Sequence, residues 1–398
     1  MSRALFHFRP RVAPVPAPGA EVAAWHLVTS EYPPDVGGVS GYTWQLARAM
    51  ASAGDEVHVW CPGPARPSAA GVAVHPELGS MSWTDLRRLD ARLDAYPAPR
   101  RLLVQWVPHG FGYRSMNLGF CLWLARRARH GDRVELMVHE PYMEFNWRSP
   151  SHSAMAAVHR LMTLVILSAA CRVWIAIPAW EACLRPYALG RDLPMAWLPI
   201  PGCLEPGEAV DAAVVRARYA APDRPVVGHF GSHGTAITSL LDACVPALMA
   251  NPSRPSLLLL GADGPLYGNA LITRHPDWRD RVHATGFLDD QALAAHLRAC
   301  DLLIQPYPDG VTSRRTSVMA CLSQARPVVT TRGRLTEPLW SASGAVALAN
   351  AGDPACLAAE AVRLLADPGV RSRLGAEGRR LYDATFSLDR VVTTLRAA

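Results

Sequence analysis

The sequence predicts an α/β protein with two doubly wound, Rossmann-like domains. Its 398 residues, half of them hydrophobic, are enough for two soluble cores. Short apolar strands alternate with helical patterns in both halves, as in parallel βαβ units. A Pro/Gly-rich stretch, 199–207, separates the halves. We therefore expect a flexible tail over 1–20, a first domain over 21–200, a linker over 201–222, a second domain over 223–380 and a closing segment over 381–398.

The basic residues restrict the chemistry, because the chain contains no lysine and all 40 of its basic side chains are arginine. A pyridoxal-phosphate enzyme needs a lysine for its Schiff base, and a Walker-type phosphate loop needs one beside the phosphates. Both classes are therefore excluded. The net charge of +6 suits an anionic ligand, and the dispersal of the arginines argues against nucleic acid as a partner.

The nine cysteines include no Cys-x-x-Cys pair, which argues against a zinc site and against a disulfide framework. This pattern is typical of a reducing compartment, and we expect a cytoplasmic protein. No apolar run is long enough to cross a bilayer, and no signal-peptide pattern is present. The longest apolar stretch, 161–178, is interrupted by Arg172 and fits the end of a buried helix followed by a strand.

The first βαβ unit begins with an apolar strand over 25–30 and ends with a strand over 56–60. Between them, Gly37 and Gly38 directly precede a helix with Trp44, Leu46, Ala47 and Met50 at helical spacing. Paired glycines before a helix allow a charged group of a ligand to approach the backbone closely. The alternative is that the two glycines only form a tight turn.

This opening resembles a known family. Tyr-Pro-Pro-x-x-Gly-Gly at 32–38, a helix ending in Leu-Ala-Arg-Ala-Met-Ala-x-x-Gly at 46–54 and the strand that follows are similar to the start of the retaining GT-B glycosyltransferases. The resemblance extends over about 22–396. It implies two Rossmann-like domains facing across a cleft, a last helix that crosses back to the first domain, and a place for Gly37 and Gly38 near the donor phosphates.

The middle of the first domain offers a helix over 116–129 and a histidine after a strand. The helix has an apolar face of Leu118, Cys121, Leu122 and Leu124, which we expect in the core; the alternative is a weak contact with a membrane surface. His139 follows the strand over 135–138, and such strand ends face the ligand cleft of parallel sheets. By resemblance His139 faces the reacting sugar, and the alternative is a histidine hydrogen-bonded within the core.

The second domain begins with a strand over 225–230 and the loop Gly231-Ser232-His233-Gly234. Its glycine spacing does not match the dinucleotide fingerprint. The resembled family has here a Gly-Arg loop and a nearby lysine that hold the donor diphosphate, and this chain has neither basic residue. His233 and the loop amides of Gly231 and Ser232 are the local substitutes. Resemblance also assigns Phe287 and Leu288 to the nucleotide base, with core packing as the alternative.

The stretch 306–331 follows a buried strand over 301–305 and carries Arg314 and Arg315 just before a helix that begins at Thr316. Helix N–H groups and arginines favour phosphate. The alternative is a solvated arginine pair. We predict that Arg314 or Arg315, with the N–H groups of Thr316, Ser317 and Val318, stabilises the leaving diphosphate.

The resembled family carries two acidic residues here, eight positions apart, and the second holds the ribose. Counting forward from Asp309 gives Ser317, and counting back from the Pro-Val-Val strand gives Ala320; neither is acidic. The contact with the ribose is therefore lost, moved, or made by hydroxyls such as those of Thr316 and Ser317.

These features predict a retaining, metal-independent glycosyltransferase, without a permanently bound cofactor, that moves a sugar from a UDP- or GDP-sugar to a small acceptor, as in natural-product biosynthesis. A lipid or polysaccharide acceptor remains open. A nucleotide-sugar epimerase of the same fold is one competitor, although the expected cleft offers few carboxylates beyond Glu31, Asp35, Glu140 and Glu144. A non-catalytic sugar-nucleotide-binding partner is another. The sequence does not indicate the oligomeric state.

Overall fold

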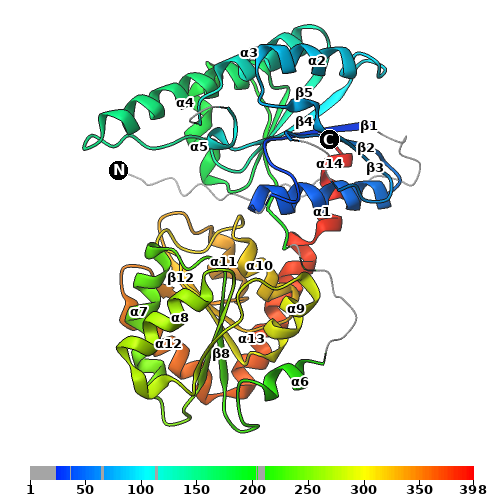
Figure 1. Ribbon diagram of the computed structural model, residues 1–398. Helices are drawn as coiled ribbons and strands as arrows, with labels where there is room; N and C mark the ends of the chain where they lie inside the picture. The colour runs from blue at the N-terminus through cyan, green and yellow to red at the C-terminus, as the bar shows by residue number, and fades with distance from the viewer. Residues whose placement is uncertain (1–23, 36, 64–66, 113–114, 203, 205–210) are drawn as a thin grey trace.

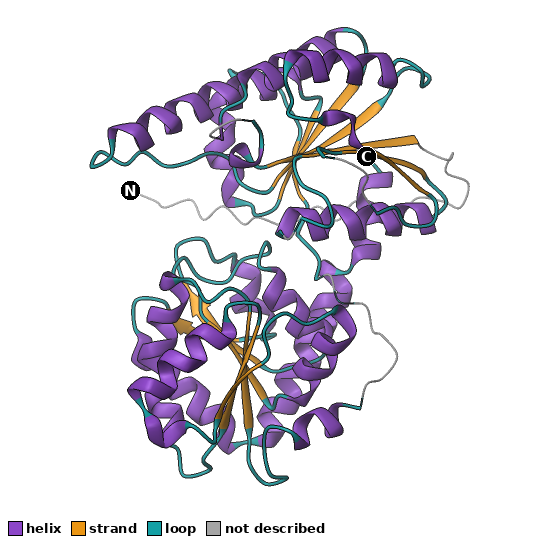
Figure 2. Cartoon of the chain, viewed as in Figure 1, coloured by secondary structure: helices purple, strands orange, loops and turns teal. Residues whose placement is uncertain are grey.

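The computed structural model describes residues 24–35, 37–63, 67–112, 115–202, 204 and 211–398. The chain forms two lobes, one above the other in Figure 1, and each contains a parallel sheet with helices on both faces (Figure 2). The predicted fold class, α/β with two Rossmann-like domains, is confirmed. The expected tail over 1–20 lies outside the described residues.

The first lobe has a seven-stranded sheet in the order β3-β2-β1-β4-β5-β6-β7, with every neighbouring pair parallel. Its strands are β1 (Ala24–Thr29), β2 (Glu56–Trp60), β3 (Val72–His75), β4 (Arg101–Trp106), β5 (Arg133–Val138), β6 (Arg172–Ile175) and β7 (Met195–Trp197). Its helices are α1 (Gly38–Ser52), α2 (Trp83–Leu93), α3 (Leu118–Arg129), α4 (Pro150–Ala169) and α5 (Ala179–Leu184). The order reverses between β1 and β4, and open sheets of this kind bind ligands at such a reversal.

The second lobe repeats the plan with a six-stranded parallel sheet in the order β10-β9-β8-β11-β12-β13. Its strands are β8 (Val226–Phe230), β9 (Ser256–Leu260), β10 (Val282–Ala284), β11 (Leu302–Gln305), β12 (Val328–Arg332) and β13 (Ala347–Asn350). The helices after β7 are α6 (Ala212–Ala217), α7 (Thr235–Met249), α8 (Gly264–Arg274), α9 (Asp290–Ala299), α10 (Thr316–Ser323), α11 (Pro338–Ser343), α12 (Pro354–Ala366), α13 (Pro368–Leu381) and α14 (Leu388–Arg396). The reversal here lies between β8 and β11.

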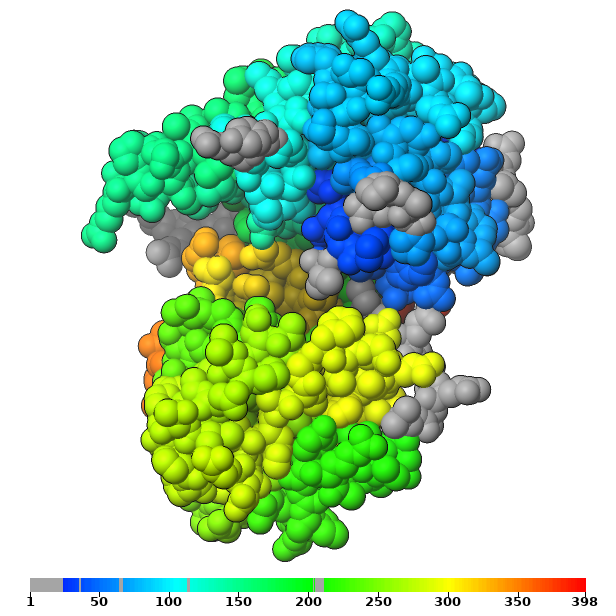
Figure 3. All heavy atoms as spheres, viewed as in Figure 1, coloured from blue at the N-terminus to red at the C-terminus, as the bar shows by residue number. Residues whose placement is uncertain are grey.

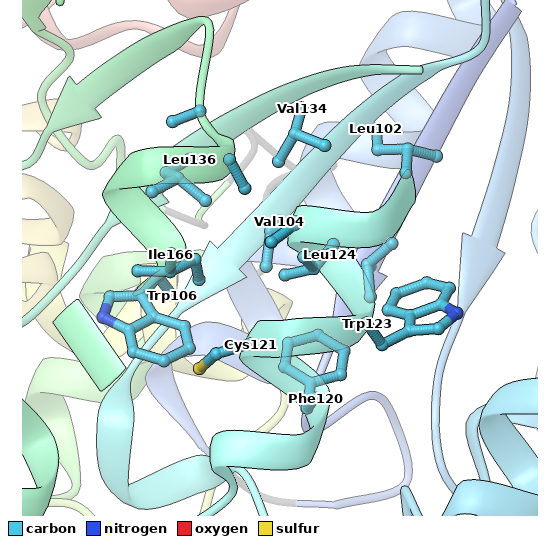
Figure 4. Packing of buried hydrophobic residues seen from close by; sticks show 14 of the residues in the cluster. Leu102, Val104, Trp106, Phe120, Cys121, Trp123, Leu124, Val134, Leu136 and Ile166 are labelled. Atoms are coloured by element: carbon cyan, nitrogen blue, oxygen red, sulfur yellow. The ribbon is translucent and has the colours of Figure 1, made fainter. Parts of the chain in front are cut away.

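Helix α3 packs into the core of the first lobe, where its side chains meet those of β4, β5 and α4 (Figure 4). Phe120, Cys121, Trp123 and Leu124 are fully buried, whereas Leu122 is 45% exposed. The predicted apolar face was therefore wrong at Leu122, because the buried stripe is shifted toward the two aromatic residues. This stripe is covered by protein.

Helix α4 is long and apolar enough, by length and composition alone, to cross a membrane. Core helices of soluble proteins pass the same test. Its buried side chains include Met162, Ile166 and Leu167, which join the core that α3 also lines. Along the side that carries these three residues, α4 packs as a core helix of the first lobe.

Two segments connect the lobes. Within the region expected as a linker, α6 packs against α9 of the second lobe, and Arg216 forms an ion pair with Asp301 at 2.6 Å. At the end of the chain α14 packs against α1, where Val391, Val392 and Leu395 join the core of the first lobe. The chain therefore passes between the lobes twice, and Figure 1 shows this return near the C-terminus.

Several elements were not predicted from the sequence, namely β3, β7, β13 and α2. The strands are short, at three or four residues each, and β3, β7 and β13 lie at sheet edges. Edge strands bury less surface than central ones, so their hydrophobic pattern is weak. Helix α2 begins with a capping box in which Ser82 and Asp85 each hydrogen-bond the other's backbone N–H, a signal that the sequence contains.

Helix α10 ends in a left-handed residue that is not glycine. The N–H of Ala325 donates to the carbonyl of Leu322 at 2.9 Å, and the N–H of Arg326 donates to that of Cys321 at 3.0 Å. This is a Schellman motif, and its left-handed position is occupied by Ala325 at φ 53°. Glycine adopts this conformation without the steric cost that a Cβ imposes.

We expect Ala325→Gly to stabilise the protein by about 0.5–1 kcal/mol, because the relief at positive φ exceeds the entropy that glycine adds to the unfolded chain. Urea unfolding measures the change. The matched control is Ala359→Gly on the exposed face of α12, which we expect to cost about 1 kcal/mol. Equal losses in the two variants would contradict the assignment.

Candidate active site between the two domains

A cavity of about 320 Å³ lies between the two lobes. It is built from the carboxyl ends of strands β1, β4 and β5 in the first lobe and from the turn before α10 in the second. Figure 3 shows the two lobes in contact, one above the other. The lining residues are Ser30, Glu31, Gly37, Gly38, Val39, Val107, His109, Gly110, His139, Glu140, Ile200, Arg314 and Thr316. The cavity thus brings together five of the predicted site residues, namely Gly37, Gly38, His139, Arg314 and Thr316.

A buried carboxylate fixes the turn that carries the two arginines. Glu337 accepts hydrogen bonds from the N–H and hydroxyl of Ser313 and from the indole of Trp340. Burial raises the pKa of this carboxyl, and the hydrogen bonds oppose that rise. The turn is therefore positioned by a residue that follows it by 24 positions.

The same serine also joins the two lobes. The Ser313 hydroxyl also lies 2.8 Å from the carbonyl of Ala176, so its one proton is shared between this oxygen and Glu337, and it accepts from the indole of Trp197 at 3.0 Å. The Ser313 carbonyl accepts from the N–H of Ile200 at 3.0 Å. The arginine turn is thus held against the first lobe by backbone and side-chain bonds together.

Arg314 reaches across the cavity to the first lobe. Its guanidinium donates to the Glu140 carboxylate at 2.8 Å and lies 5.6 Å from the ring of Trp180. The other oxygen of Glu140 lies 3.6 Å from His109 Nδ1. In this state Arg314 is already paired with a carboxylate of the protein.

Arg315 has no such partner. Its guanidinium lies 4.5 Å from the ring of Tyr307, and within the described residues no carboxylate lies at ion-pair distance from it. Its Nε is buried without an acceptor. Burial, followed by repulsion from Arg314, lowers the pKa of Arg315. A half-buried, uncompensated cation of this kind attracts an anion.

The start of α10 adds two free donors. Among the described residues, no acceptor takes the N–H groups of Thr316 and Ser317, whereas that of Val318 donates to the carbonyl of Arg315 at 3.0 Å. The Val318 side chain is fully buried. The predicted trio of donors therefore reduces to Thr316 and Ser317, because Val318 already has a partner.

The loop after β8 lies beside these donors. A Cβ placed on Gly231 would lie 3.6 Å from the side chain of Ser317, so this loop approaches the start of α10 closely. Gly231 itself has φ 141°, which favours glycine. Ser317 also shares a hydrogen bond of 2.7 Å with the hydroxyl of Tyr307. Gly231, Ser317 and Arg315 thus gather around one end of α10.

His233 lies deeper in the same loop. It is 8% exposed, packs edge-on against His229, and neither of its ring nitrogens has a hydrogen-bond partner in the described structure. Burial lowers its pKa to about 4. The ring is therefore neutral near pH 7, so His233 would take the place of the missing basic residue of the family by hydrogen bonding and not by charge.

The start of α1 already holds an anion of the protein. One oxygen of the Glu31 carboxylate accepts from the N–H groups of Val39 at 3.0 Å and Ser40 at 2.9 Å. A Cβ on Gly37 would come within 2.5 Å of that oxygen, whereas one on Gly38 would meet nothing within 4 Å. Gly37 thus makes room for Glu31, and only Gly38 leaves open backbone toward the cavity.

His139 lines the cavity from the end of β5. Its Nε2 is 2.9 Å from the side-chain oxygen of Gln105, and its ring packs edge-on against Tyr42 at 5.2 Å. Burial, and then repulsion from Arg314, lowers its pKa to about 3. Near neutral pH the ring is an uncharged hydrogen-bonding group. His139 thus lines the cavity, as the cleft interpretation expects, and it is also hydrogen-bonded within the core, as the alternative expects.

The remaining predicted residues do not line the cavity. Phe287 is 74% exposed and Leu288 half-buried after β10, and Ser232 lies in the loop after β8. Asp309 forms an ion pair with Arg334 at 3.1 Å near the surface. Asp309 is thus engaged by an arginine of its own lobe.

Sequence reasoning did not identify Gln105 or Glu337, and it counted Glu140 only among the carboxylates of an epimerase. Glu140 directly follows His139, so the same strand-end argument could have placed it. Gln105 and Glu337 carry no motif, because their roles depend on contacts between segments far apart in the chain.

Both lobes match known families of glycosyltransferase domains. Residues 36–182 match the Glycosyltransferase Family 4 domain, and residues 224–367 match the Glycosyl transferases group 1 domain. The chain belongs to the glycosyltransferases. The predicted membership of the glycosyltransferases is thereby confirmed, with one family domain in each lobe. No curated protein matches the chain in sequence.

Solved structures agree with this glycosyltransferase in fold. Sucrose-phosphate synthase from Thermosynechococcus elongatus superposes with a TM-score of 0.69 at 19% identity, covering 94% of this chain and 97% of that one. Anabaena HepE in complex with UDP and glucose superposes with a TM-score of 0.66 at 15% sequence identity, and the match covers 94% of this chain and 98% of that one. A trehalose-phosphate synthase from Burkholderia xenovorans in complex with glucose-6-phosphate superposes with a TM-score of 0.65 at 11% sequence identity, and the match covers 94% of this chain and 99% of that one. The GT-B architecture is therefore shared over nearly the whole chain.

We expect Glu337→Ala to lower the free energy of unfolding by about 2–4 kcal/mol, since it leaves buried donors of Ser313 and Trp340 without an acceptor. Urea unfolding measures the loss. The control is Glu360→Ala, which removes the partner of the exposed Arg363 and should cost under about 1 kcal/mol. Similar losses in the two variants would show that Glu337 does not anchor the turn.

His139 predicts a pH dependence of stability. Its pKa is lowered to about 3 in the folded state, so the unfolded chain takes up the proton first as the pH falls below 6.5, and stability is lost. Between pH 7.5 and pH 5.5 the share of His139 is about 1.4 kcal/mol. Urea unfolding at both pH values should show that the free energy of unfolding falls by about 1.4 kcal/mol less in His139→Gln than in the wild type. An equal loss would place His139 in contact with water.

Proposed function

We propose that this glycosyltransferase moves a hexose from a nucleotide diphosphate sugar, with UDP or GDP as the nucleotide, to a small acceptor, with retention of configuration. The observation that carries the proposal is the uncompensated Arg315 beside the free N–H groups of Thr316 and Ser317. A diphosphate supplies the charge and the acceptor oxygens that this end of α10 lacks. That HepE was solved with UDP and glucose supports a sugar nucleotide as the donor.

The chemistry follows from the charges. When the bond between the sugar carbon and the phosphate oxygen breaks, negative charge grows on the leaving diphosphate, and Arg315 and the positive end of α10 neutralise it. The acceptor hydroxyl attacks from the same face and gives its proton to the departing oxygen. The protein positions the two substrates, and neither a protein nucleophile nor a metal is needed in this scheme.

The acceptor would bind on the side of the first lobe, near His139 and His109. His139, being neutral, would donate or accept a single hydrogen bond to the sugar without adding charge. We infer a cytoplasmic role in assembling a natural product, in line with a small acceptor. The lipopolysaccharide enzyme WaaG shares the fold at 15% identity with a TM-score of 0.65, so a lipid or polysaccharide acceptor is a second outcome to test.

The test begins with nucleotides. Thermal unfolding with UDP, GDP, ADP and dTDP should show one diphosphate that raises the melting temperature most, because only ligands bound by the folded state stabilise it. The matching sugar nucleotide is then incubated with and without a panel of acceptors. Transfer to an acceptor supports the proposal; a changed sugar nucleotide without acceptor indicates an epimerase, and binding without turnover indicates a non-catalytic partner.

We expect Arg315→Ala to weaken binding of the chosen nucleotide diphosphate about 10- to 100-fold, the effect of losing a charge-assisted hydrogen bond. Isothermal titration calorimetry measures it. The control is Arg334→Ala, whose partner is the surface carboxylate of Asp309 and whose removal should change affinity less than about 2-fold. Unchanged affinity in Arg315→Ala would move the diphosphate away from α10.

A further inference from the structure

Two carboxylates face the cavity from the first lobe, those of Glu31 and Glu140. Among the described lining residues of this lobe no arginine balances them, and His139 is uncharged near pH 7. His109 Nδ1 lies 3.6 Å from Glu140. The wall on the acceptor side is therefore acidic, in contrast to the cationic end of α10 on the other side.

The two carboxylates are held differently. Glu31 is fixed by two backbone N–H groups, so its carboxylate is held in place at the start of α1. Glu140 is fixed by Arg314, a residue of the opposite lobe, at 2.8 Å. The side chain of Glu140 is 43% exposed, and among the described residues its side-chain partners are Arg314 and the nearby imidazole of His109. Glu140 can therefore be released when Arg314 finds another anion.

The diphosphate is such an anion, and this step rests on the proposed function. Arg314 neighbours Arg315 in the turn, and a guanidinium prefers a phosphate group, which offers more charge and more acceptor oxygens than one carboxylate. When Arg314 turns to the diphosphate, Glu140 loses its partner. Glu140 then faces the space in which the acceptor binds with His109 as its remaining neighbour, and it lies in the same wall as Glu31, which stays bound to the N–H groups of α1.

We propose that the acceptor carries a protonated amine. When the donor binds, Arg314 leaves Glu140 for the diphosphate, and the free carboxylate of Glu140, with Glu31 beside it, binds the ammonium group of the acceptor. The ammonium is an anchor, and the nucleophile is a hydroxyl group elsewhere on the same molecule. A phosphorylated acceptor, such as the glucose-6-phosphate bound to the trehalose-phosphate synthase, would meet two carboxylates and the donor diphosphate at close range. The wall excludes it by repulsion.

The first test measures the exchange. Glu140→Gln keeps the size of the side chain but releases Arg314, so calorimetry should show the nucleotide diphosphate binding about 3- to 10-fold more tightly than to the wild type. The control is Glu360→Gln, a carboxylate paired with Arg363 on the surface, which should leave the affinity unchanged. Equal or weaker binding to Glu140→Gln overturns the exchange.

The second test measures the selection, using glucosamine, glucose and glucose 6-phosphate as probes on the nucleotide-loaded protein. Glucosamine should bind at least about 5-fold more tightly than glucose, with glucose 6-phosphate weakest, and Glu140→Gln should narrow this gap. Equal affinities, tightest binding of the phosphate, or no binding of glucosamine overturns the assignment of an amine. If no nucleotide binds the wild type at all, the proposed function fails instead, and the two failures are thus distinguishable.

Discussion

The site depends on one buried carboxylate and the serine it holds. Glu337 fixes the backbone and hydroxyl of Ser313, and Ser313 in turn bonds to the carbonyl of Ala176 and the indole of Trp197 in the other lobe. A buried carboxylate is costly to desolvate, and its hydrogen bonds offset that cost. The two arginines that follow are therefore presented from a rigid turn, although arginine side chains are themselves flexible. A rigid turn is useful here, because the arginine side chains that it carries have to bind a diphosphate at a fixed position.

The charges at the cavity differ between the two lobes. The second lobe supplies positive charge from Arg314, which lines the cavity, and from Arg315 beside it at the start of α10, whereas the first supplies the carboxylates of Glu31 and Glu140. Buried histidines at 139 and 233 add hydrogen-bonding groups without charge, because burial keeps them neutral. Among the described residues that line the cavity, Arg314 and Glu140 form the ion pair that joins a cation of the second lobe to a carboxylate of the first.

The sequence revealed the fold because the alternation of apolar strands and helices is a local pattern, repeated in both halves. It also located His139 and the arginine turn, since positions at the ends of parallel strands follow from that pattern. It could not reveal the link from Ser313 to Glu337 or the pairing of Arg314 with Glu140 across 174 positions, which depend on how distant segments meet. Nor could it show that Glu31 fills the start of α1, which changes the meaning of Gly37.

The return of the chain to its first lobe has a practical consequence. Helix α14 supplies Val391, Val392 and Leu395 to a core shared with Leu46 and Met50, and Arg101 donates to the carbonyl of Leu395 at 3.0 Å. Cutting the gene once between β7 and α6 would therefore strip the amino-terminal fragment of a piece of its own interior. To produce that lobe by itself, one would have to graft the final helix back through a short engineered connection, or permute the ends of the polypeptide.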